Sequence, residues 1–183
     1  RIQLLLAKSQ LLRDGGRTQE AYELLAGGLA TQPEQSELLY ESALLAEKLG
    51  RHEAMEASLR KLIRLKPEHA HAYNALGYSF AERNQRLEEA EQLVLKALQL
   101  SPDDPFIIDS MGWVLYRKGD NQGALAHLQR AFSIRPDPEI AAHLGEVLWA
   151  LGRRDEAKRI WQEAAKAHPG NEVLAEVIKR FAP

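Results

Sequence analysis

The sequence contains no cysteine among its 183 residues. This absence excludes disulfide bonds, thiolate zinc sites, redox cysteine pairs and cysteine nucleophiles, and it leaves the cellular compartment open. No apolar run approaches the roughly 18 residues that a membrane-spanning helix requires. An excess of one charge is also missing, because 24 Lys and Arg against 26 Asp and Glu give a net charge of -2. The composition therefore produces no overall field that would hold nucleic acid or an anionic membrane.

Motifs for catalysis, metals and cofactors are missing as well. The histidines form no HExxH motif, and the glycine-containing segments 152–155 and 170–172 lack the preceding strand of a phosphate-binding loop. The set most similar to a catalytic triad is Asp109, Ser110 and His143, which we expect on neighbouring helices. Helical N–H groups are already hydrogen-bonded within the helix, so they cannot form the oxyanion hole that such a triad needs. We predict no enzyme, no cofactor and no metal site, and interpret these residues as the lining of a groove.

What the chain does contain is a fixed period. Prolines recur 34, 35, 34 and 33 residues apart, at Pro33, Pro67, Pro102, Pro136 and Pro169. A column of small residues keeps nearly the same spacing, at Ser9, Ala43, Gly77, Gly112 and Gly145. Periods of about 20–50 residues are typical of solenoids, in which each repeat packs only against its neighbours. The sequence therefore predicts one continuous repeat array.

Each unit of the array has the pattern of two helices. In the third unit, Tyr73, Leu76 and Phe80 share one face of a helix predicted over residues 72–83. After a short break, residues 87–100 carry an apolar face of their own and end just before a Ser-Pro pair, because proline cannot continue a helix. The later units follow the same plan, which predicts a helical hairpin in each.

The recurring small residues predict where the two helices of a hairpin touch. The pairs are Gly77 with Ala90, Gly112 with Ala124, and Gly145 with Ala157. A glycine inside an exposed helix costs about 1 kcal/mol relative to alanine, so its recurrence at one position indicates a packing role. We expect the two helix backbones to approach closely at each pair.

These columns resemble the tetratricopeptide repeat family, whose signature places Leu-Gly, alanines, aromatics and a proline along about 34 residues. The fourth unit carries the pattern as Ile108, Met111, Gly112, Leu115, Ala124, Leu128, Ala131 and Pro136. The resemblance implies an all-α fold, a right-handed solenoid of antiparallel helix pairs in one continuous domain. It places the units at residues 2–35, 36–69, 70–104, 105–137 and 138–171, followed by a capping helix at 172–181.

The two ends of the array differ. Lys8 and Ser9 stand where the family has Leu-Gly, so the first unit is degenerate and makes a poor solubilising cap. We therefore expect further repeats before Arg1 in a longer parent protein. Residues 172–181 have one apolar face, as expected of a helix that covers the last repeat. The natural C-terminus is accordingly expected at or near Pro183.

Function in this family resides on the concave face built from the first helix of each pair, and the resemblance indicates which positions face it. Aromatic residues gather at those positions, where they serve a partner better than they serve solvent. The predicted partner-binding residues are Tyr40, Tyr78, Phe106, Asp109, Trp113, Tyr116, Arg117, His143, Glu146 and Trp149. Packing against the next helix is an alternative role for Trp113 and Trp149, and the sequence leaves it open.

The predicted groove is more acidic than basic. Its acids are Asp14, Glu37, Glu41, Glu47, Glu82, Asp109, Glu139 and Glu146, and its bases are Arg13, Lys48 and Arg117. A mildly basic, apolar peptide or helix of a partner protein suits such a groove, whereas the phosphate backbone of a nucleic acid does not. The basic run 60–64 falls on a second helix, away from the groove, and we interpret it as a solvated face.

A narrower resemblance involves residues 75–78, 109–116 and 142–152, which look like the C-terminal repeats of proteobacterial outer-membrane tetratricopeptide lipoproteins. That group is anchored through a lipidated N-terminus and faces the periplasm. Some members are adaptors that bind a carboxyl-terminal processing protease and help deliver substrates such as cell-wall hydrolases. The resemblance implies the same adaptor role, a periplasmic location, and a membrane link only through a lipidated N-terminus outside residues 1–183.

Two alternatives stay open within the same fold. The chain could be a scaffold in envelope biogenesis or polysaccharide secretion without a protease partner, since such proteins look alike at this level. The lack of cysteine suits the periplasm and the cytoplasm equally, so a cytoplasmic location stays open too. In each case we predict a non-catalytic scaffold that binds a protein or an extended peptide.

Overall fold

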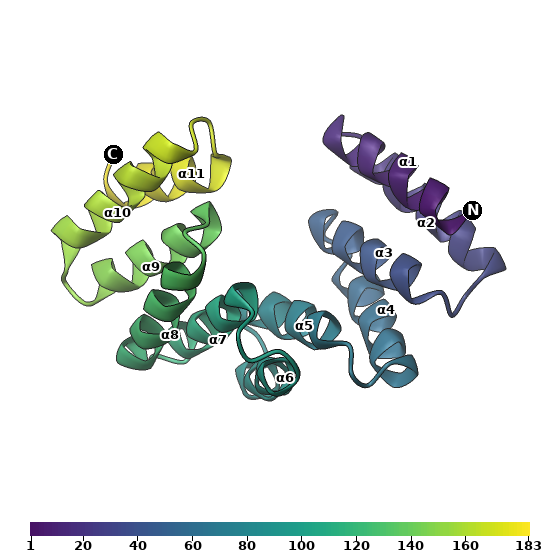
Figure 1. Ribbon diagram of the computed structural model, residues 1–183, viewed down its shortest axis with the longest axis horizontal. Coiled ribbons are helices and arrows are strands. Elements are labelled where there is room, and N and C mark those ends of the chain that lie inside the picture. The colour runs from purple at the N-terminus through teal and green to yellow at the C-terminus, as the bar shows by residue number, and fades with distance from the viewer.

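The computed structural model describes residues 1–183 and is entirely α-helical. Its helices are α1 Ile2–Asp14, α2 Thr18–Thr31, α3 Ser36–Lys48, α4 His52–Leu65, α5 Ala70–Glu82, α6 Leu87–Leu100, α7 Pro105–Arg117, α8 Asn121–Ile134, α9 Pro138–Ala150, α10 Arg154–Ala167 and α11 Glu172–Phe181. Consecutive helices from α1 to α10 form hairpins, and α11 follows the last hairpin (Figure 1). The all-α solenoid predicted from the sequence is confirmed. None of these helices combines the length and the apolar character needed to cross a lipid bilayer.

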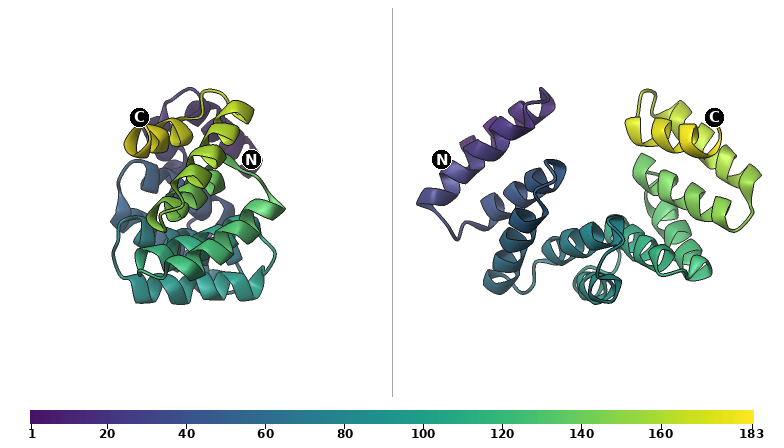
Figure 2. Two further views of the ribbon diagram at one scale, coloured as in Figure 1. Left: turned by 90° about the vertical axis from the view of Figure 1, so that its left-hand side faces the viewer. Right: turned by 180° about the vertical axis from the view of Figure 1, so that it is seen from behind.

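The hairpins stack side by side into an open arc. Helices α1 and α11 lie near its two ends, and α5, α6 and α7 lie at its middle (Figure 1). Helix α6 is on the outer side of the arc, whereas α5 and α7 lie toward the inside. The view from behind shows the same opening between the two arms (Figure 2). The inner side of α5 and α7 is therefore part of the concave face.

Side chains cap the first helix in three of the five hairpins, at His69, Asp104 and Asp137. Asp104 and Asp137 accept hydrogen bonds from the backbone N–H groups in the first turns of α7 and α9. Pro105 and Pro138 follow them at the first helical position, where a backbone N–H is not needed. The first helix of every hairpin has 13 residues and the second has 14.

The turn inside each hairpin depends on a residue in the left-handed backbone conformation. Gly50 and Gly119 supply it with φ values of 74° and 93°, which cost a glycine little because it has no Cβ. In the third hairpin Asn84 takes this position with a φ of 54°, and Arg86 adds a second left-handed residue with a φ of 49°. This turn covers residues 83–86 and is one residue longer than the others. The extra residue explains the 35-residue spacing in the third unit.

The predicted close approach inside the hairpins is confirmed for two glycines. A methyl group added at Gly77 would lie 2.9 Å from the carbonyl oxygen of Ala90. One added at Gly112 would lie 3.2 Å from the carbonyl oxygen of Ala124 and 2.7 Å from Cγ of Leu128. Any side chain larger than hydrogen would therefore push the two helices of the hairpin apart.

In the fifth hairpin, the atoms nearest to Gly145 belong to a side chain of α10 that the pattern of small residues did not predict. A methyl group added at Gly145 would meet the indole ring of Trp161, with Nε1 only 2.0 Å away. The indole N–H donates a hydrogen bond to the carbonyl oxygen of Ala142 at 3.3 Å. Trp161 is larger than the aliphatic residues at the same position in the other hairpins, so its ring fills the space that the glycine leaves.

The apolar core runs along the arc between the layers of helices. Its largest cluster joins α3 to α7 and includes the fully buried Leu59, Leu76 and Phe80. A second cluster joins α8 to α11 around Leu128 and Trp161. Because each cluster spans more than one hairpin, every repeat depends on its neighbours for burial of its apolar face.

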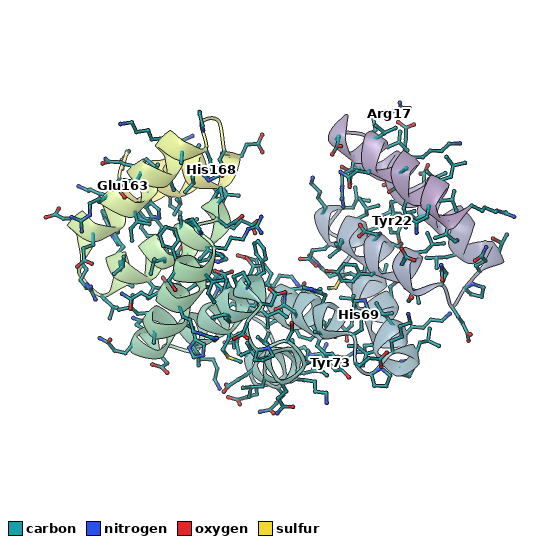
Figure 3. The ribbon with its side chains drawn as sticks, viewed as in Figure 1. Arg17, Tyr22, His69, Tyr73, Glu163 and His168 are labelled. Carbon is teal, nitrogen blue, oxygen red and sulfur yellow. The ribbon has the colours of Figure 1, made fainter.

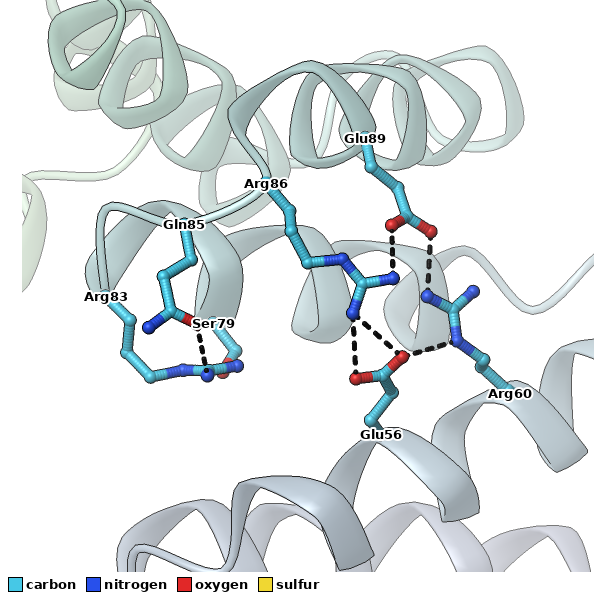
Figure 4. A network of polar contacts seen from close by, with 7 residues as sticks. All are labelled: Glu56, Arg60, Ser79, Arg83, Gln85, Arg86 and Glu89. Carbon is cyan, nitrogen blue, oxygen red and sulfur yellow. Dashed lines mark hydrogen bonds and ion pairs between the residues drawn. The ribbon is translucent and has the colours of Figure 1, made fainter.

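An ion-pair ring links the second and third hairpins on their outer helices (Figure 4). Arg60 lies 2.8 Å from Glu56 and 2.7 Å from Glu89, and Arg86 lies 3.2 Å from Glu56 and 2.7 Å from Glu89. Hydrogen bonds from Arg60 lower the pKa of both Glu56 and Glu89. The interpretation of the basic run 60–64 as a merely solvated face is therefore wrong for Arg60, which binds a carboxylate of the next repeat.

The tight hairpin contact can be tested with Gly112→Ala. We expect the free energy of unfolding to fall by about 1–3 kcal/mol, because the added methyl group overpacks the interface with α8. Gly27→Ala is the matched control, since a methyl group there meets nothing within 4 Å and alanine is the better helix former. Chemical denaturation followed by circular dichroism measures both changes. A Gly112→Ala variant as stable as Gly27→Ala would contradict the close approach.

The ion-pair ring predicts a salt-dependent contribution to stability. Arg60→Gln is expected to lower the free energy of unfolding by up to about 1 kcal/mol at low salt, because the partly exposed pairs are weakened by solvent. In roughly 1 M NaCl the difference from the wild type should nearly vanish. Arg64→Gln, on the same helix but without an ion pair, serves as the control. Equal effects of the two substitutions at low salt would show that the ring contributes nothing.

Candidate partner-binding surface

Two pockets open between odd-numbered helices. The N-terminal pocket, of about 320 Å³, is lined by Leu6, Ser9, Gln10, Arg13, Ser36, Glu37, Tyr40, Glu41, Lys66 and His69. The C-terminal pocket, of about 310 Å³, is lined by Tyr78, Glu82, Trp113, Arg117, Glu139, Ala142, His143, Glu146, Val173, Glu176, Val177 and Arg180. The C-terminal pocket is formed by α5, α7, α9 and α11, so it includes the inner side of the middle of the arc (Figure 1).

Six of the ten predicted partner-binding residues line these two pockets. Five of the ten line the C-terminal pocket, namely Tyr78, Trp113, Arg117, His143 and Glu146. Tyr40 lines the N-terminal pocket, where its ring lies 5.3 Å from the ring of His69. Figure 3 labels His69, which precedes the first residue of α5. The C-terminal pocket thus collects residues that come from three separate repeats.

Asp109 and Tyr116 support the C-terminal pocket from behind. Asp109 is 5% exposed and contacts His143, and the ring of Tyr116 lies 5.1 Å from that of Trp113. Trp113 itself is 3% exposed, because its ring stacks on His143 at 4.1 Å and lies under the guanidinium of Arg117 at 4.9 Å. Trp113 therefore contributes only an edge to the wall of the pocket, and its main contacts are packing contacts.

Phe106 and Trp149 line neither pocket. The ring of Phe106 packs near α8 and lies 5.5 Å from the guanidinium of Arg135. The ring of Trp149 lies 5.9 Å from Trp161 and 5.8 Å from Phe181, in an aromatic cluster that joins α9, α10 and α11. Of the two roles that the sequence left open for Trp149, the structure shows packing between helices.

A chain of hydrogen bonds crosses the floor of the C-terminal pocket. Nδ1 of His143 lies 2.9 Å from Oδ1 of Asp109, and Nε2 lies 3.2 Å from the hydroxyl of Tyr78. The Tyr78 hydroxyl donates to Oε2 of Glu82 at 2.6 Å. Arg117 donates to the backbone carbonyl of Glu82 at 3.1 Å and lies 3.4 Å from its Oε1. This chain ties α5, α7 and α9 together through side-chain hydrogen bonds, one of which ends on the backbone carbonyl of Glu82.

The pocket shifts the protonation of two of these groups. Burial by itself lowers the pKa of His143, but the negative charges of Asp109, Glu82 and Glu139 outweigh burial and raise the pKa above its usual range. Burial raises the pKa of Tyr78 well above its usual range, and the nearby carboxylate of Glu82 adds to this effect. At neutral pH Tyr78 therefore keeps its proton, and His143 is shifted toward the charged form.

The triad-like set of Asp109, Ser110 and His143 is only partly assembled. Asp109 and His143 do lie on neighbouring first helices and contact one another. The hydroxyl of Ser110 instead donates to the carbonyl oxygen of Phe106, one turn earlier in its own helix, at 3.0 Å. The group that faces Nε2 of His143 is the Tyr78 hydroxyl. The serine of the predicted set is therefore not aligned with the histidine, and no cluster of histidine and acidic side chains is arranged to hold a metal ion.

The contribution of α11 to the C-terminal pocket was not expected from the sequence. This helix was expected only to cover the last repeat, which Leu174 and Val177 do. Its other face forms a wall of the C-terminal pocket through Glu176 and Arg180. Arg180 also donates a hydrogen bond to Glu146 on α9. The charged face of residues 172–181 was visible in the sequence, but nothing local showed that it turns toward the groove.

The charges of the C-terminal pocket favour the binding of a cationic group. Both arginines are already paired, Arg117 with Glu82 and Arg180 with Glu146. Glu139 and Glu176 also line the pocket and have no side-chain partner. Two free carboxylates beside aromatic and apolar walls suit an arginine or lysine side chain, because an anion would have to break an existing ion pair.

Three models of the tetratricopeptide repeat match the chain, over residues 36–69, 56–105 and 115–179. Among curated proteins, the TPR repeat-containing protein PA4667 of Pseudomonas aeruginosa is 45% identical over 145 residues. The match covers 79% of this chain and 25% of that protein. The chain thus spans about a quarter of the length of this relative.

Solved structures show the same architecture. TTC0263, a thermophilic TPR protein of Thermus thermophilus, is similar with a TM-score of 0.86 and 25% identity, covering 100% of this chain and 97% of that one. The pilF structure from Pseudomonas aeruginosa has a TM-score of 0.74 at 18% identity, covering 98% and 83%. The similarity to the pilF structure concerns the fold alone.

An all-helical repeat array with a lined concave face belongs to the class of α-solenoid scaffolds. The repeat period, the hairpins and the matching models agree on the family, and the chain belongs to the tetratricopeptide repeat family. Proteins of this family generally act as scaffolds for protein interactions, and their fold is typically non-catalytic.

The packing role of Trp149 can be tested by Trp149→Ala. We expect a loss of about 2–4 kcal/mol in the free energy of unfolding, because the ring leaves a cavity beside Trp161 and Phe181. Trp149→Phe keeps an aromatic ring in the cluster and should lose less. Denaturation and amide hydrogen exchange of α10 and α11 measure the change. A Trp149→Ala variant with unchanged stability would assign this residue to partner contact instead.

Proposed function

We propose that this chain is a non-catalytic scaffold whose C-terminal pocket receives a basic, partly apolar segment of a partner protein. The observation that carries the proposal is the pairing of charges in that pocket. Its arginines are neutralised by Glu82 and Glu146, whereas Glu139 and Glu176 remain free. The general role of tetratricopeptide proteins as protein-interaction scaffolds supports the same function.

The apolar residues of the pocket support the proposal that the partner segment is partly apolar. Ala142, Val173 and Val177 line it beside the polar groups, and Val173 is 39% exposed. An exposed valine next to free carboxylates fits a peptide in which basic and aliphatic side chains alternate. Tyr78 and the edge of Trp113 complete an aromatic surface for such a peptide.

At a finer level, we propose that the parent protein is a periplasmic adaptor for a carboxyl-terminal processing protease or its substrates. Residues 109–116 and 142–152 support this proposal by their resemblance to outer-membrane tetratricopeptide lipoproteins. The anchor would be a lipidated N-terminus outside residues 1–183. The alternative is a scaffold for envelope biogenesis or polysaccharide secretion, and a cytoplasmic location is the alternative compartment.

The pocket is tested with a fluorescent, acetylated and amidated peptide of alternating arginine and leucine residues. Binding measured by fluorescence anisotropy should weaken about five- to tenfold in the double variant Glu139→Gln/Glu176→Gln, because both free carboxylates are lost. Glu68→Gln/Glu163→Gln removes two exposed carboxylates outside the pocket and is the matched control. Equal affinities of the two double variants would refute the pocket as the binding site.

The choice of partner is tested by affinity capture from a bacterial envelope extract with the same two double variants. Retention of a processing protease or cell-wall hydrolase by the wild type and the control, with its loss from Glu139→Gln/Glu176→Gln, would support the adaptor role. Specific retention of polysaccharide-secretion or envelope-assembly proteins would favour the alternative.

A further inference from the structure

His143 lies among charged groups from every helix that forms the C-terminal pocket. Its side chain is 12% exposed, with Trp113 stacked on one face of the ring. The titratable and charged groups around it are Tyr78 and Glu82 on α5, Asp109 and Arg117 on α7, Glu139 and Glu146 on α9, and Glu176 and Arg180 on α11. A change in the charge of His143 therefore changes the electrostatic potential throughout the pocket.

The hydrogen-bond distances determine how many protons His143 carries. An ionised carboxylate only accepts hydrogen bonds, so the contact of 2.9 Å with Asp109 places a proton on Nδ1. The Tyr78 hydroxyl has one proton, and its contact of 2.6 Å with Glu82 uses it. The contact of 3.2 Å between Nε2 and the Tyr78 oxygen then needs a proton from Nε2. All three contacts are satisfied only by the doubly protonated, positively charged ring.

Loss of the Nε2 proton rearranges this chain. Nε2 becomes an acceptor, so the Tyr78 hydroxyl can donate to His143 or to Glu82 but not to both. When the hydroxyl turns to Nε2, Oε2 of Glu82 is left without its donor. Arg117 lies near the other oxygen, Oε1, at 3.4 Å. Because Glu82 lines the pocket, the released oxygen can accept a hydrogen bond from an incoming N–H group.

We propose that the C-terminal pocket exchanges a proton for a cationic side chain: His143 holds two protons in the empty pocket and gives up one when an arginine or lysine of the partner binds. This inference rests on the proposed function, since it specifies how the same site is regulated. Loss of this proton has two effects, and both strengthen the binding of a cationic side chain. Deprotonation removes a positive charge from the pocket, and it frees an oxygen of Glu82 for the ligand.

The direction of the pH dependence follows from this exchange. Affinity for a basic segment rises as the pH increases through the pKa of His143. The empty pocket shows the opposite trend in stability. Because the pKa of His143 is raised on folding, its contribution is fully present below the unfolded value of about 6.5 and is lost as the pH rises through the folded value.

The double protonation of the His143 ring is tested by ¹⁵N NMR of its imidazole nitrogens in the complete chain. At about pH 6.5 both nitrogens of His143 should be protonated, and its titration midpoint should lie above the value of about 6.5 expected for an unperturbed histidine. A single protonated nitrogen at that pH, or a midpoint at or below about 6.5, would overturn the proposal.

The exchange is tested with the arginine–leucine peptide between about pH 6.5 and pH 9, where arginine and Tyr78 keep their protons. Wild-type affinity should rise about tenfold across this range, the effect expected when a ligand lowers the histidine pKa by about one unit. His143→Gln keeps every carboxylate but cannot titrate, so its affinity should stay flat. A matched peptide with citrulline in place of arginine reports binding that does not need the positive charge.

The outcomes separate the two proposals. If the arginine and citrulline peptides bind equally at every pH, the proposed function fails, and the exchange fails with it. Arginine-dependent binding that is flat with pH, or that rises equally in His143→Gln, leaves the proposed function standing and refutes the proton exchange alone. A rise confined to the wild type and the arginine peptide supports both.

Discussion

Each hairpin of this chain presents apolar surface that only another hairpin can cover, and the rest of the structure depends on this constraint. The two helices of a hairpin approach closely where Gly77 faces Ala90 and where Gly112 faces Ala124. The core clusters then run from one hairpin into the next, instead of closing around one centre. Stability is consequently shared between neighbours, and the array curves into an arc with two different faces (Figure 2).

Because the hairpins stack, residues that are one repeat period apart in the sequence come into contact. Asp109 and His143 are 34 residues apart, as are Glu146 and Arg180, and each pair is in contact. Glu82 and Arg117 are 35 residues apart, which reflects the longer turn of the third hairpin. A polar residue at a given position of one first helix therefore meets its counterpart in the next repeat. The C-terminal pocket is built from such contacts across consecutive repeats.

The sequence predicted the fold nearly completely because periodicity is a local and repeated signal. Proline spacing and apolar faces located the hairpins, and the predicted range 172–181 coincides with α11. Errors arose where one side chain changed a neighbour's environment. Trp161 lies nearest to Gly145, a contact that the pattern of small residues did not predict, and Arg60 joined an ion-pair ring across two hairpins. Neither effect has a signature in the spacing of residues.

The candidate site, too, was predictable from the sequence only in part. The sequence by itself determined the helices, the order of repeats and the acidic character of the groove, because these follow from composition and period. Only the tertiary structure decided that Tyr78 on α5 reaches His143 on α9, 65 residues away, and that α11 contributes a wall. Those contacts depend on the curvature of the arc, which is the sum of all the packing contacts between hairpins. Curvature is a collective property, so no single stretch of sequence encodes it.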